Sequence, residues 1–349
     1  MSTELIDDLE YKDMGLTGLS NLGNSCFMNS ALQCLSHSYE LNDFLKDGGF
    51  KKKLNKKAES LILLEWDKLR ELMWSENCVI SPGGFFSSVQ KVAKIKDKEL
   101  FTGFAQNDST EFLTFIIDCF HTAIGREVEM DITGEALTDT DKLAEDCFNM
   151  MKNMYKKEYS ELLKMFYGIH VSKISTKENR YLSSTVEPFL TLDLQLPEAS
   201  TENSISLIDC VDAYTAVEVL DGDNKYETDE GGKIIAHKQI SFWSLPDILI
   251  ISIKRFSNTL RKNTKLVTFP LEGLDMREYV IGYDKDTYVY DLYAVCNHSG
   301  DVSGGHYTSS VKNANGRWYN FNDSNITYIV DEQRIVSPEA YCFFYRKKK

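Results

Sequence analysis

One stretch near the N-terminus constrains this chain more than any other. Residues 18–33 read GLSNLGNSCFMNSALQ, a turn-rich segment that runs directly into a predicted helix. The apolar side chains of that helix recur at helical spacing and predict one buried face: Met28, Ala31, Leu32 and Leu35. Asn24 and Ser25 are favourable N-cap residues, so Cys26 is predicted to lie in the first turn of the helix.

The predicted position of Cys26 has a chemical consequence. The unpaired N–H groups and the dipole at a helix N-terminus favour an anion, and the thiolate is the nucleophilic form of cysteine. The same N–H groups can hold an oxyanion during acyl transfer, and Asn21 offers a side-chain amide donor nearby. The alternative is a small buried cysteine that only packs, and this stretch alone leaves both open.

This segment resembles the Cys box of the ubiquitin-specific proteases, whose pattern reads Gly-Leu-x-Asn-Leu-Gly-Asn-Thr-Cys-Tyr-Met-Asn-Ser. Ser25 stands in place of the threonine and Phe27 in place of the tyrosine, and both replacements are mild. The resemblance implies that Cys26 is the nucleophile of a papain-like thiol protease. It also implies that Asn21 and the Cys26 N–H hold the oxyanion.

A second candidate region lies near the C-terminus. A Gly-rich loop at 297–305 precedes a predicted strand that begins at His306, and a turn at 313–316 leads into another strand. A turn of this kind between two strands makes a hairpin, so Asn322 or Asp323 is predicted to return beside His306. A nucleophilic thiol needs a base within about 3 Å and a third group that orients the base.

His306 has the context expected of a base among the six histidines of the chain. Gly304 and Gly305 precede it and let backbone approach closely without an intervening side chain. For His306 taken alone, a hydrogen-bonded structural histidine is the alternative. The other histidines lack this context and are interpreted as ordinary structural residues: His37, His121, His170, His237 and His298.

Residues 304–323, together with 341–345, resemble the His box of the same family. The resemblance implies that Asn322 accepts from the imidazole N–H and fixes the orientation of the ring. Asp323 would support this pair or polarise the oxyanion site. The resemblance also implies substrate contacts at three further positions: Gly304, Gly305 and Tyr307.

Residues 106–112 read QNDSTEF and form a third candidate region. Asp108 is a favourable N-cap and Glu111 follows three residues later, which predicts a capping-box-like helix start. Capping alone would explain both acids. The segment also resembles the Gln-x-Asp-x-x-Glu-Phe box of the family, which implies that Asp108 and Glu111 contact the arginines of the ubiquitin tail.

Composition narrows the classes of partner and location. The formal net charge of −14 argues against a nucleic-acid partner and favours a basic one. The eight cysteines are scattered without Cys-x-x-Cys spacing, which favours reduced thiols in a cytoplasmic or nuclear protein. The first residues lack the apolar core of a signal peptide, and the apolar run at 248–253 is too short to span a bilayer, so no membrane partner is expected.

Periodicity predicts a helical first half and a β-rich second half. Helices are expected at 54–74, from 85 to 92, within 106–120 and at 148–166, and an acidic loop or insertion at 125–146. From residue 167 the pattern is that of strands, including 185–194, 249–253 and 288–295.

On the resemblance, the fold class is α+β. A polar arm at 1–14 precedes one papain-like catalytic domain at 15–346. A helical thumb spans about 15–166, β fingers about 167–245 and a β palm about 246–346.

The fingers depart from the family pattern in one respect. Many relatives carry two Cys-x-x-Cys pairs there that bind structural zinc. The corresponding positions in this chain hold residues that cannot replace four thiolates, namely Thr176, Asn179, Glu227 and Glu230. We therefore expect neither a structural zinc nor any other metal or cofactor.

The resemblance implies a monomeric thiol protease that hydrolyses the bond after the C-terminal glycine of ubiquitin, acting on ubiquitin and ubiquitin-conjugated proteins. Two alternatives stay open at this point: the same chemistry on a ubiquitin-like modifier, and a non-catalytic ubiquitin-binding scaffold. The intact set of catalytic residue types argues against the scaffold.

Overall fold

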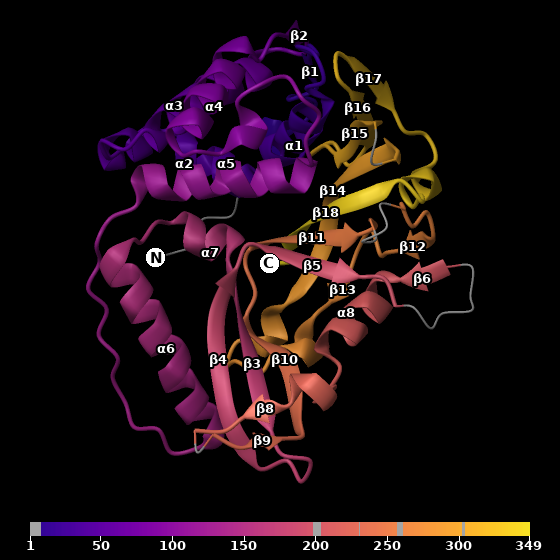
Figure 1. The fold of residues 1–349 in the computed structure, drawn as a ribbon. Helices are drawn as coiled ribbons and strands as arrows, with labels where there is room; N and C mark the ends of the chain where they lie inside the picture. Colours follow the sequence, from indigo (N-terminus) through magenta and orange to yellow (C-terminus); the bar gives the residue numbers. More distant parts are fainter. Residues whose placement is uncertain (1–7, 198–203, 230, 257–260, 302–303) are drawn as a thin grey trace.

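A computed structural model describes residues 8–197, 204–229, 231–256, 261–301 and 304–349 of the chain. Its helices gather at one end, a large sheet lies beside them, and a second sheet extends away as a long arm (Figure 1). These parts have the α+β architecture of thumb, palm and fingers, and we use those names below.

The thumb is a bundle of five helices, with α1 and α5 next to the palm (Figure 1). Their bounds are α1 Cys26–Ser36, α2 Tyr39–Lys46, α3 Glu59–Ser75, α4 Gly83–Ile95 and α5 Ser109–Ile124. A short parallel pair, β1 (Gly18–Leu19) and β2 (Val79–Ile80), leads the chain into α1. Both α1 and α5 are buried on nearly every face, because α1 lies between the rest of the thumb and the palm sheet.

The palm is one mixed sheet in the order β17-β16-β15-β14-β18-β11-β5, with β13 paired to β14. Its strands are β5 Thr191–Gln195, β11 Ile248–Lys254, β13 Leu274–Asp275, β14 Val289–Gly300, β15 Gly305–Lys312, β16 Trp318–Asn322, β17 Asn325–Tyr328 and β18 Ala340–Lys347. Along β11, Ile250 packs into the core shared with the thumb, whereas Leu249 and Ile251 pack into a second core on the other face. Burial on both faces explains why the first four residues of this strand are all apolar.

Helix α8 (Leu207–Thr215) contributes to that second core, and the parallel pair β6 (Ser204–Ser206) and β12 (Leu266–Thr268) lies at the same side of the palm. The sheet is therefore held rigidly between two layers. This rigidity matters because β15 and β16 carry the candidate base and its partner.

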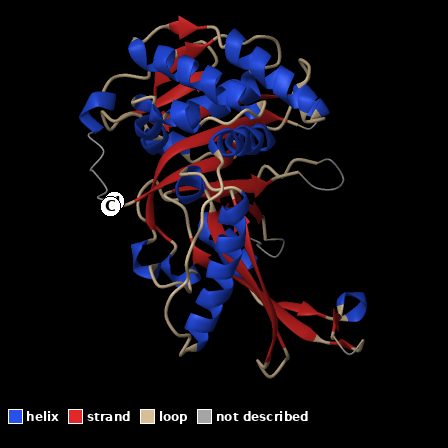
Figure 2. Cartoon of the chain, turned by 90° about the vertical axis from the view of Figure 1, so that its left-hand side faces the viewer, coloured by secondary structure: helices blue, strands red, loops and turns tan. Residues whose placement is uncertain are grey.

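The fingers are a four-stranded antiparallel sheet in the order β4-β3-β10-β7. The strands are β3 Gly168–Ser175, β4 Tyr181–Phe189, β7 Glu218–Leu220 and β10 Ala236–Ser244, and a small hairpin, β8 (Tyr226–Glu227) with β9 (Lys233–Ile234), extends the arm. Figure 2 shows this hairpin projecting to one side of the long strands.

Backbone turns shape the fingers at the positions considered above for a zinc site. Thr176 donates its N–H to the carbonyl of Arg180 (2.8 Å), and its hydroxyl accepts from the Arg180 N–H (3.2 Å). In the other hairpin, Thr228 pairs with Gly232 in the same way. The described residues contain no group of three or more His, Cys, Asp or Glu that could hold a metal, although Glu230 lies outside them.

The acidic segment needs a correction, because its last part is helical. Helix α6 runs from Asp139 to Lys157 and begins with a capping box between Thr138 and Asp141. Its apolar side packs on the fingers through Ala144 and Cys147. The predicted helix at 148–166 is thus the second half of α6, followed by a break and then by α7 (Leu162–Phe166). The many acidic residues between 127 and 146 leave no clear apolar period, so the start of this helix is not predicted, although acidic side chains favour a first helical turn.

The described end of the predicted polar arm docks onto the thumb. Residues 8–11 form a short 3-10 helix, and the ring of Tyr11 stacks on Tyr39 at 4.3 Å and meets Trp74 edge-on. In the part of the chain that the structure covers, no helix is long and apolar enough to cross a membrane.

Candidate active site

Cys26 is the first residue of α1, as the sequence predicts, and its side chain is buried. Ser25 occupies the N-cap position but does not cap, because its hydroxyl accepts from the N–H of Leu22 (2.8 Å). The Asn24 side chain donates instead to the carbonyl of Phe104 (3.0 Å). The predicted capping by Asn24 or Ser25 is therefore wrong, and its failure leaves the first N–H groups of α1 available to an anion.

The predicted hairpin brings Asn322 beside His306. Strands β15 and β16 pair antiparallel across a turn at residues 313–317, and His306 Nε2 lies 2.7 Å from Asn322 Oδ1. Because a carboxamide oxygen only accepts, this bond places the imidazole proton on Nε2. The other ring nitrogen, Nδ1, is then left with a free lone pair and can act as a base.

Helix α1 packs against β15, so Cys26 lies beside the strand that carries His306. The backbone N–H of Tyr307, the residue that follows His306, favours the thiolate form of Cys26. Burial raises the pKa of Cys26, while the N–H groups of Tyr307, Phe27 and Cys26 itself oppose that rise. The Asp323 carboxylate raises the pKa further.

Asp323 follows Asn322 in a left-handed conformation (φ +52°) and turns its carboxylate toward the thumb. One carboxylate oxygen accepts from Nδ2 of Asn21 (2.9 Å) and the other from Nδ2 of Asn29 (2.7 Å). The backbone carbonyl of Asp323 accepts from the Leu19 N–H (3.0 Å). Asp323 thus joins the end of β16 to both sides of the segment that carries Cys26.

The orientation of the Asn21 carboxamide is fixed by these contacts. Its oxygen accepts from the N–H groups of Gly23 (2.9 Å) and Ser25 (3.3 Å), so its nitrogen must face Asp323. A carboxamide nitrogen carries two protons, so one remains for a further acceptor.

Asp108 caps α5 and also bonds to the palm. Its Oδ1 accepts from the N–H groups of Thr110 (2.8 Å) and Glu111 (2.9 Å), so the Asp108 half of the predicted capping box is confirmed. Its Oδ2 accepts from the hydroxyls of Tyr341 (2.5 Å) and Tyr307 (3.4 Å), both buried.

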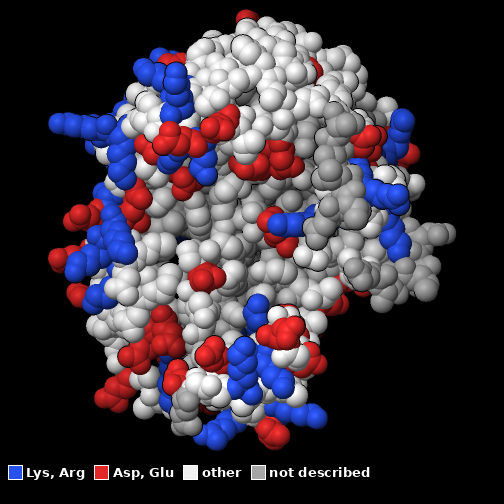
Figure 3. All heavy atoms as spheres, viewed as in Figure 1, with Lys and Arg blue, Asp and Glu red and all other residues white. Residues whose placement is uncertain are grey.

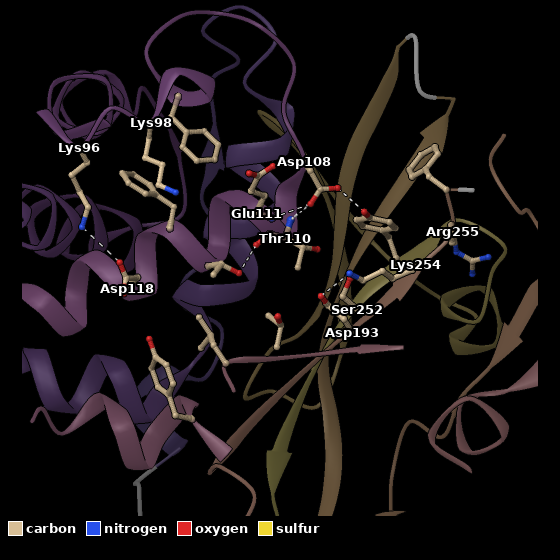
Figure 4. Close-up of a pocket in the computed structure, with 18 residues that line it drawn as sticks. Lys96, Lys98, Asp108, Thr110, Glu111, Asp118, Asp193, Ser252, Lys254 and Arg255 are labelled. Carbon is tan, nitrogen blue, oxygen red and sulfur yellow. Dashed lines mark hydrogen bonds and ion pairs between the residues drawn. The ribbon is translucent and has the colours of Figure 1, made fainter. Parts of the chain in front are cut away.

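A pocket of about 690 Å³ opens beside Asp108 between α5, β5, β11 and β18 (Figure 4). Its carboxylates are those of Asp108, Glu111, Asp118 and Asp193. Asp193 is paired with Lys254 (3.1 Å), whereas the exposed Glu111 points into the pocket. Figure 3 shows acidic side chains along the upper edge of the hollow in this face.

The three remaining predicted substrate-contact residues lie beside His306. Gly304 is exposed, Gly305 begins β15, and Tyr307 is buried behind it. A Cβ on Gly305 would lie 2.2 Å from His298 Nε2, so this position has no room for a side chain.

Sequence reasoning overlooked three side chains of this region. Gln106 and Asn29 lie within two of the segments discussed above, but their partners, Gly305 and Asp323, are about 200–300 residues away and give no local sequence signal. His298 was interpreted as ordinary, yet it is buried between Tyr307 and Tyr341 and lies 3.0 Å from Lys262 Nζ. Burial and the Lys262 ammonium lower the pKa of His298 to about 4.

A thiol at a helix N-terminus, facing a strand that carries an imidazole held by a carboxamide, is the arrangement of a papain-like cysteine peptidase. Comparison with known proteins agrees. A family profile described as ubiquitin carboxyl-terminal hydrolase matches residues 17–345. The chain therefore belongs to the ubiquitin carboxyl-terminal hydrolase family.

Several relatives are similar over nearly the whole chain. Ubiquitin carboxyl-terminal hydrolase 2 of Homo sapiens is 34% identical over 340 residues, which cover 95% of this chain and 55% of the human protein. The protein of the same name from Gallus gallus is 36% identical over 343 residues, covering 95% of this chain and 93% of its own length. The chain thus spans about half the length of the mammalian relatives it matches.

Solved structures share the fold. The SAGA Ubp8/Sgf11/Sus1/Sgf73 DUB module bound to ubiquitin aldehyde contains a chain that superposes with a TM-score of 0.74 and 25% identity. The match covers 98% of this chain and 71% of that one. The same module bound to monoubiquitin gives a TM-score of 0.72 at 25% identity, covering 97% and 70%.

Proposed function

We propose that this chain is a deubiquitinating thiol protease that hydrolyses the bond after the C-terminal glycine of ubiquitin. The observation that carries the proposal is the position of Cys26, at a helix start without a side-chain cap and in one core with Tyr307, the residue that follows His306. A cysteine that only packs would not need free N–H groups or a neighbouring imidazole held at 2.7 Å by a carboxamide.

The reaction follows from these positions. His306 Nδ1 takes the thiol proton of Cys26, and the thiolate attacks the carbonyl carbon of the terminal glycine. The imidazolium then gives its proton to the leaving amine as the C–N bond breaks, which leaves a thioester on Cys26. Water, deprotonated by His306, hydrolyses the thioester and frees the thiol.

The oxyanion that forms in each step needs donors at the helix start. We assign the N–H of Cys26 and the second Nδ2 proton of Asn21 to this role, as the family resemblance also implies. Asp323 acts through Asn21: its carboxylate bonds to Nδ2 (2.9 Å), which polarises the amide and fixes its direction. Asn322 serves as the third member of the triad because it bonds to the ring of His306 directly.

The substrate tail would lie in the pocket between thumb and palm. Asp108 and Glu111 line that pocket, and the net charge of −14 suits a partner whose tail is basic. The backbone of Gly304 and Gly305, with Tyr307 behind them, would form the wall of the channel that leads to Cys26. Support comes from the solved structures with the same fold, which hold ubiquitin or ubiquitin aldehyde.

The direct test is a ubiquitin whose C-terminus carries a thiol-reactive electrophile. Intact-mass spectrometry of the mixture is expected to show one ubiquitin per chain, attached at Cys26, and Cys26→Ala is expected to abolish the adduct and hydrolysis while ubiquitin still binds. Hydrolysis by Cys26→Ala at the wild-type rate would refute the nucleophile assignment.

The same probe built on ubiquitin-like modifiers tests the substrate. A faster reaction with another modifier would replace ubiquitin in this proposal, and ubiquitin binding without any adduct would indicate a scaffold. The monomeric state and the cytoplasmic or nuclear location stay predictions.

A further inference from the structure

Gln106 joins the thumb to the strand that carries the base. Its side-chain nitrogen donates to the carbonyl of Gly305 (3.0 Å), and its side-chain oxygen accepts from the N–H of the same glycine (3.3 Å). Gly305 immediately precedes His306, whereas Gln106 lies two residues before Asp108, the cap of α5. One carboxamide therefore holds both backbone groups of the residue next to the imidazole.

Palm residues crowd the Cα of the same glycine. An added Cβ would fall 2.2 Å from His298 Nε2 and 2.5 Å from the Ser299 carbonyl oxygen, so Gly305 is packed tightly against its own sheet. His298 cannot yield easily, because it is buried and its Nδ1 lies 3.0 Å from Lys262 Nζ. Gly305 thus has no free space beside its Cα on the palm side, and its backbone groups bond to Gln106 of the thumb.

These constraints act beside the imidazole. Cys26 begins α1, which shares one core with α5 and with residues of β15. His306 is the second residue of β15. The contact between Gln106 and Gly305 is a further connection between the thumb and the palm, and it lies next to the imidazole.

We propose that Gln106 is a positioning residue for His306. By bonding to Gly305 it sets the separation of the imidazole from the thiol, and it does so without touching either reacting group. The inference rests on the proposed function, since it concerns the thiol–imidazole pair of that reaction. A shift of about 1 Å between reacting groups can cost on the order of a hundredfold in rate.

The test uses Gln106→Met, which keeps the length of the side chain and removes both hydrogen bonds. Gln106 is exposed, so the variant is expected to fold, and Gln106→Ala serves as a second variant. Asn107→Ala is the matched control, because the Asn107 side chain donates to the carbonyl of Ala105 and not to the palm. Hydrolysis of a fluorogenic C-terminal ubiquitin amide is measured for each, together with alkylation of Cys26 by iodoacetamide from pH 5 to 10.

Both Gln106 variants are expected to lower kcat by about tenfold or more, with KM changed by less than about threefold. Alkylation at pH 6 relative to pH 9 is expected to fall several-fold, because a displaced imidazole no longer assists the thiol. Two results would overturn the proposal: Gln106 variants that match Asn107→Ala in both assays, or a raised KM with kcat unchanged, which would make Gln106 a substrate contact.

Failure of the proposed function would be recognised separately. A wild-type chain that hydrolyses no ubiquitin amide refutes that function, while the alkylation profile still decides whether Gln106 positions His306. If Gln106→Met leaves the pH dependence of Cys26 alkylation unchanged, the positioning role is overturned. If the substitution changes that pH dependence, the positioning role is supported.

Discussion

Replacing Asp108 can separate its role in capping α5 from its proposed role in contacting the substrate, which the sequence alone does not distinguish. Its carboxylate caps α5 and accepts from two buried tyrosine hydroxyls, and it also lines the pocket proposed for the ubiquitin tail. Asp108→Ala removes all of these functions together. Asp108→Asn keeps an oxygen for the cap, and it replaces the charged acceptor that faces the tyrosines with a neutral amide nitrogen that only donates.

The structure gives a magnitude for each change. Loss of an N-cap costs about 1 kcal/mol. Leaving the Tyr341 hydroxyl without its acceptor adds about 1–3 kcal/mol, because that hydroxyl is buried. Asp108→Ala is therefore expected to lower stability by about 2–4 kcal/mol. Asn caps nearly as well as Asp, but its amide nitrogen cannot accept from the Tyr341 hydroxyl, so Asp108→Asn should cost about 1–3 kcal/mol. In a chain of this size, about 2 °C of melting temperature corresponds to each kcal/mol.

The KM of the variants should depend on the charge at position 108 and not on the stability of the fold. If Asp108 pairs with an arginine of the tail, both variants are expected to raise KM for a ubiquitin amide by about tenfold, which corresponds to about 1.4 kcal/mol. Glu111→Gln, which removes an exposed carboxylate of the same pocket, is the companion variant. Thermal melting and steady-state kinetics on the same preparations separate the two effects.

One result would refute this reasoning. If Asp108→Ala loses several degrees of melting temperature while the KM of Asp108→Asn equals that of wild type, Asp108 is a cap and not a substrate contact. The reverse pattern, a raised KM with unchanged melting temperature in the Ala variant, would contradict the structural role given by the tyrosine bonds.

Three further predictions concern the site and the stability of the fold. Asn322→Ala is expected to lower kcat on the order of a hundredfold with little change in KM, because the ring of His306 loses its 2.7 Å partner; unchanged kcat would exclude Asn322 from the triad. Burial is the main cause that raises the pKa of Cys26 and the Asp323 carboxylate adds to it, so Asp323→Asn should move the pH midpoint of thiol alkylation downward; an upward move would contradict this. Burial alone would raise the pKa of Glu161, but bonds from its cationic partners hold that pKa at about 2 against an ordinary value of 4.5. The unfolded chain takes up this proton first as the pH falls, so the stabilisation is complete above about pH 4.5 and is lost between about 4.5 and 2; Glu161→Gln should cost about 1–2 kcal/mol at pH 7 in chemical denaturation and flatten the acid slope.

Much of the fold was predictable where local patterns are strong. The apolar run of β11 and the hairpin that returns Asn322 to His306 follow from periodicity and turn residues, which act over short stretches. The start of α6 was missed, because its acids suppress the apolar period although Thr138 and Asp141 form a capping box. The capping of α1 was predicted wrongly, because the Ser25 hydroxyl bonds to Leu22 and not to the helix.

The sequence by itself determined the proposed reacting groups: a thiol placed at the start of a helix, a histidine after two glycines, and an amide one hairpin strand away. Each of these depends on neighbours within about twenty residues, which is the range over which turns and periodicity act. Only the tertiary structure decided that Asp323 bonds to Asn21 and Asn29, and that Gln106 holds Gly305. Those contacts join residues about 200–300 positions apart, and side-chain hydrogen bonds at that separation exist only once the palm sheet has packed against α1 and α5.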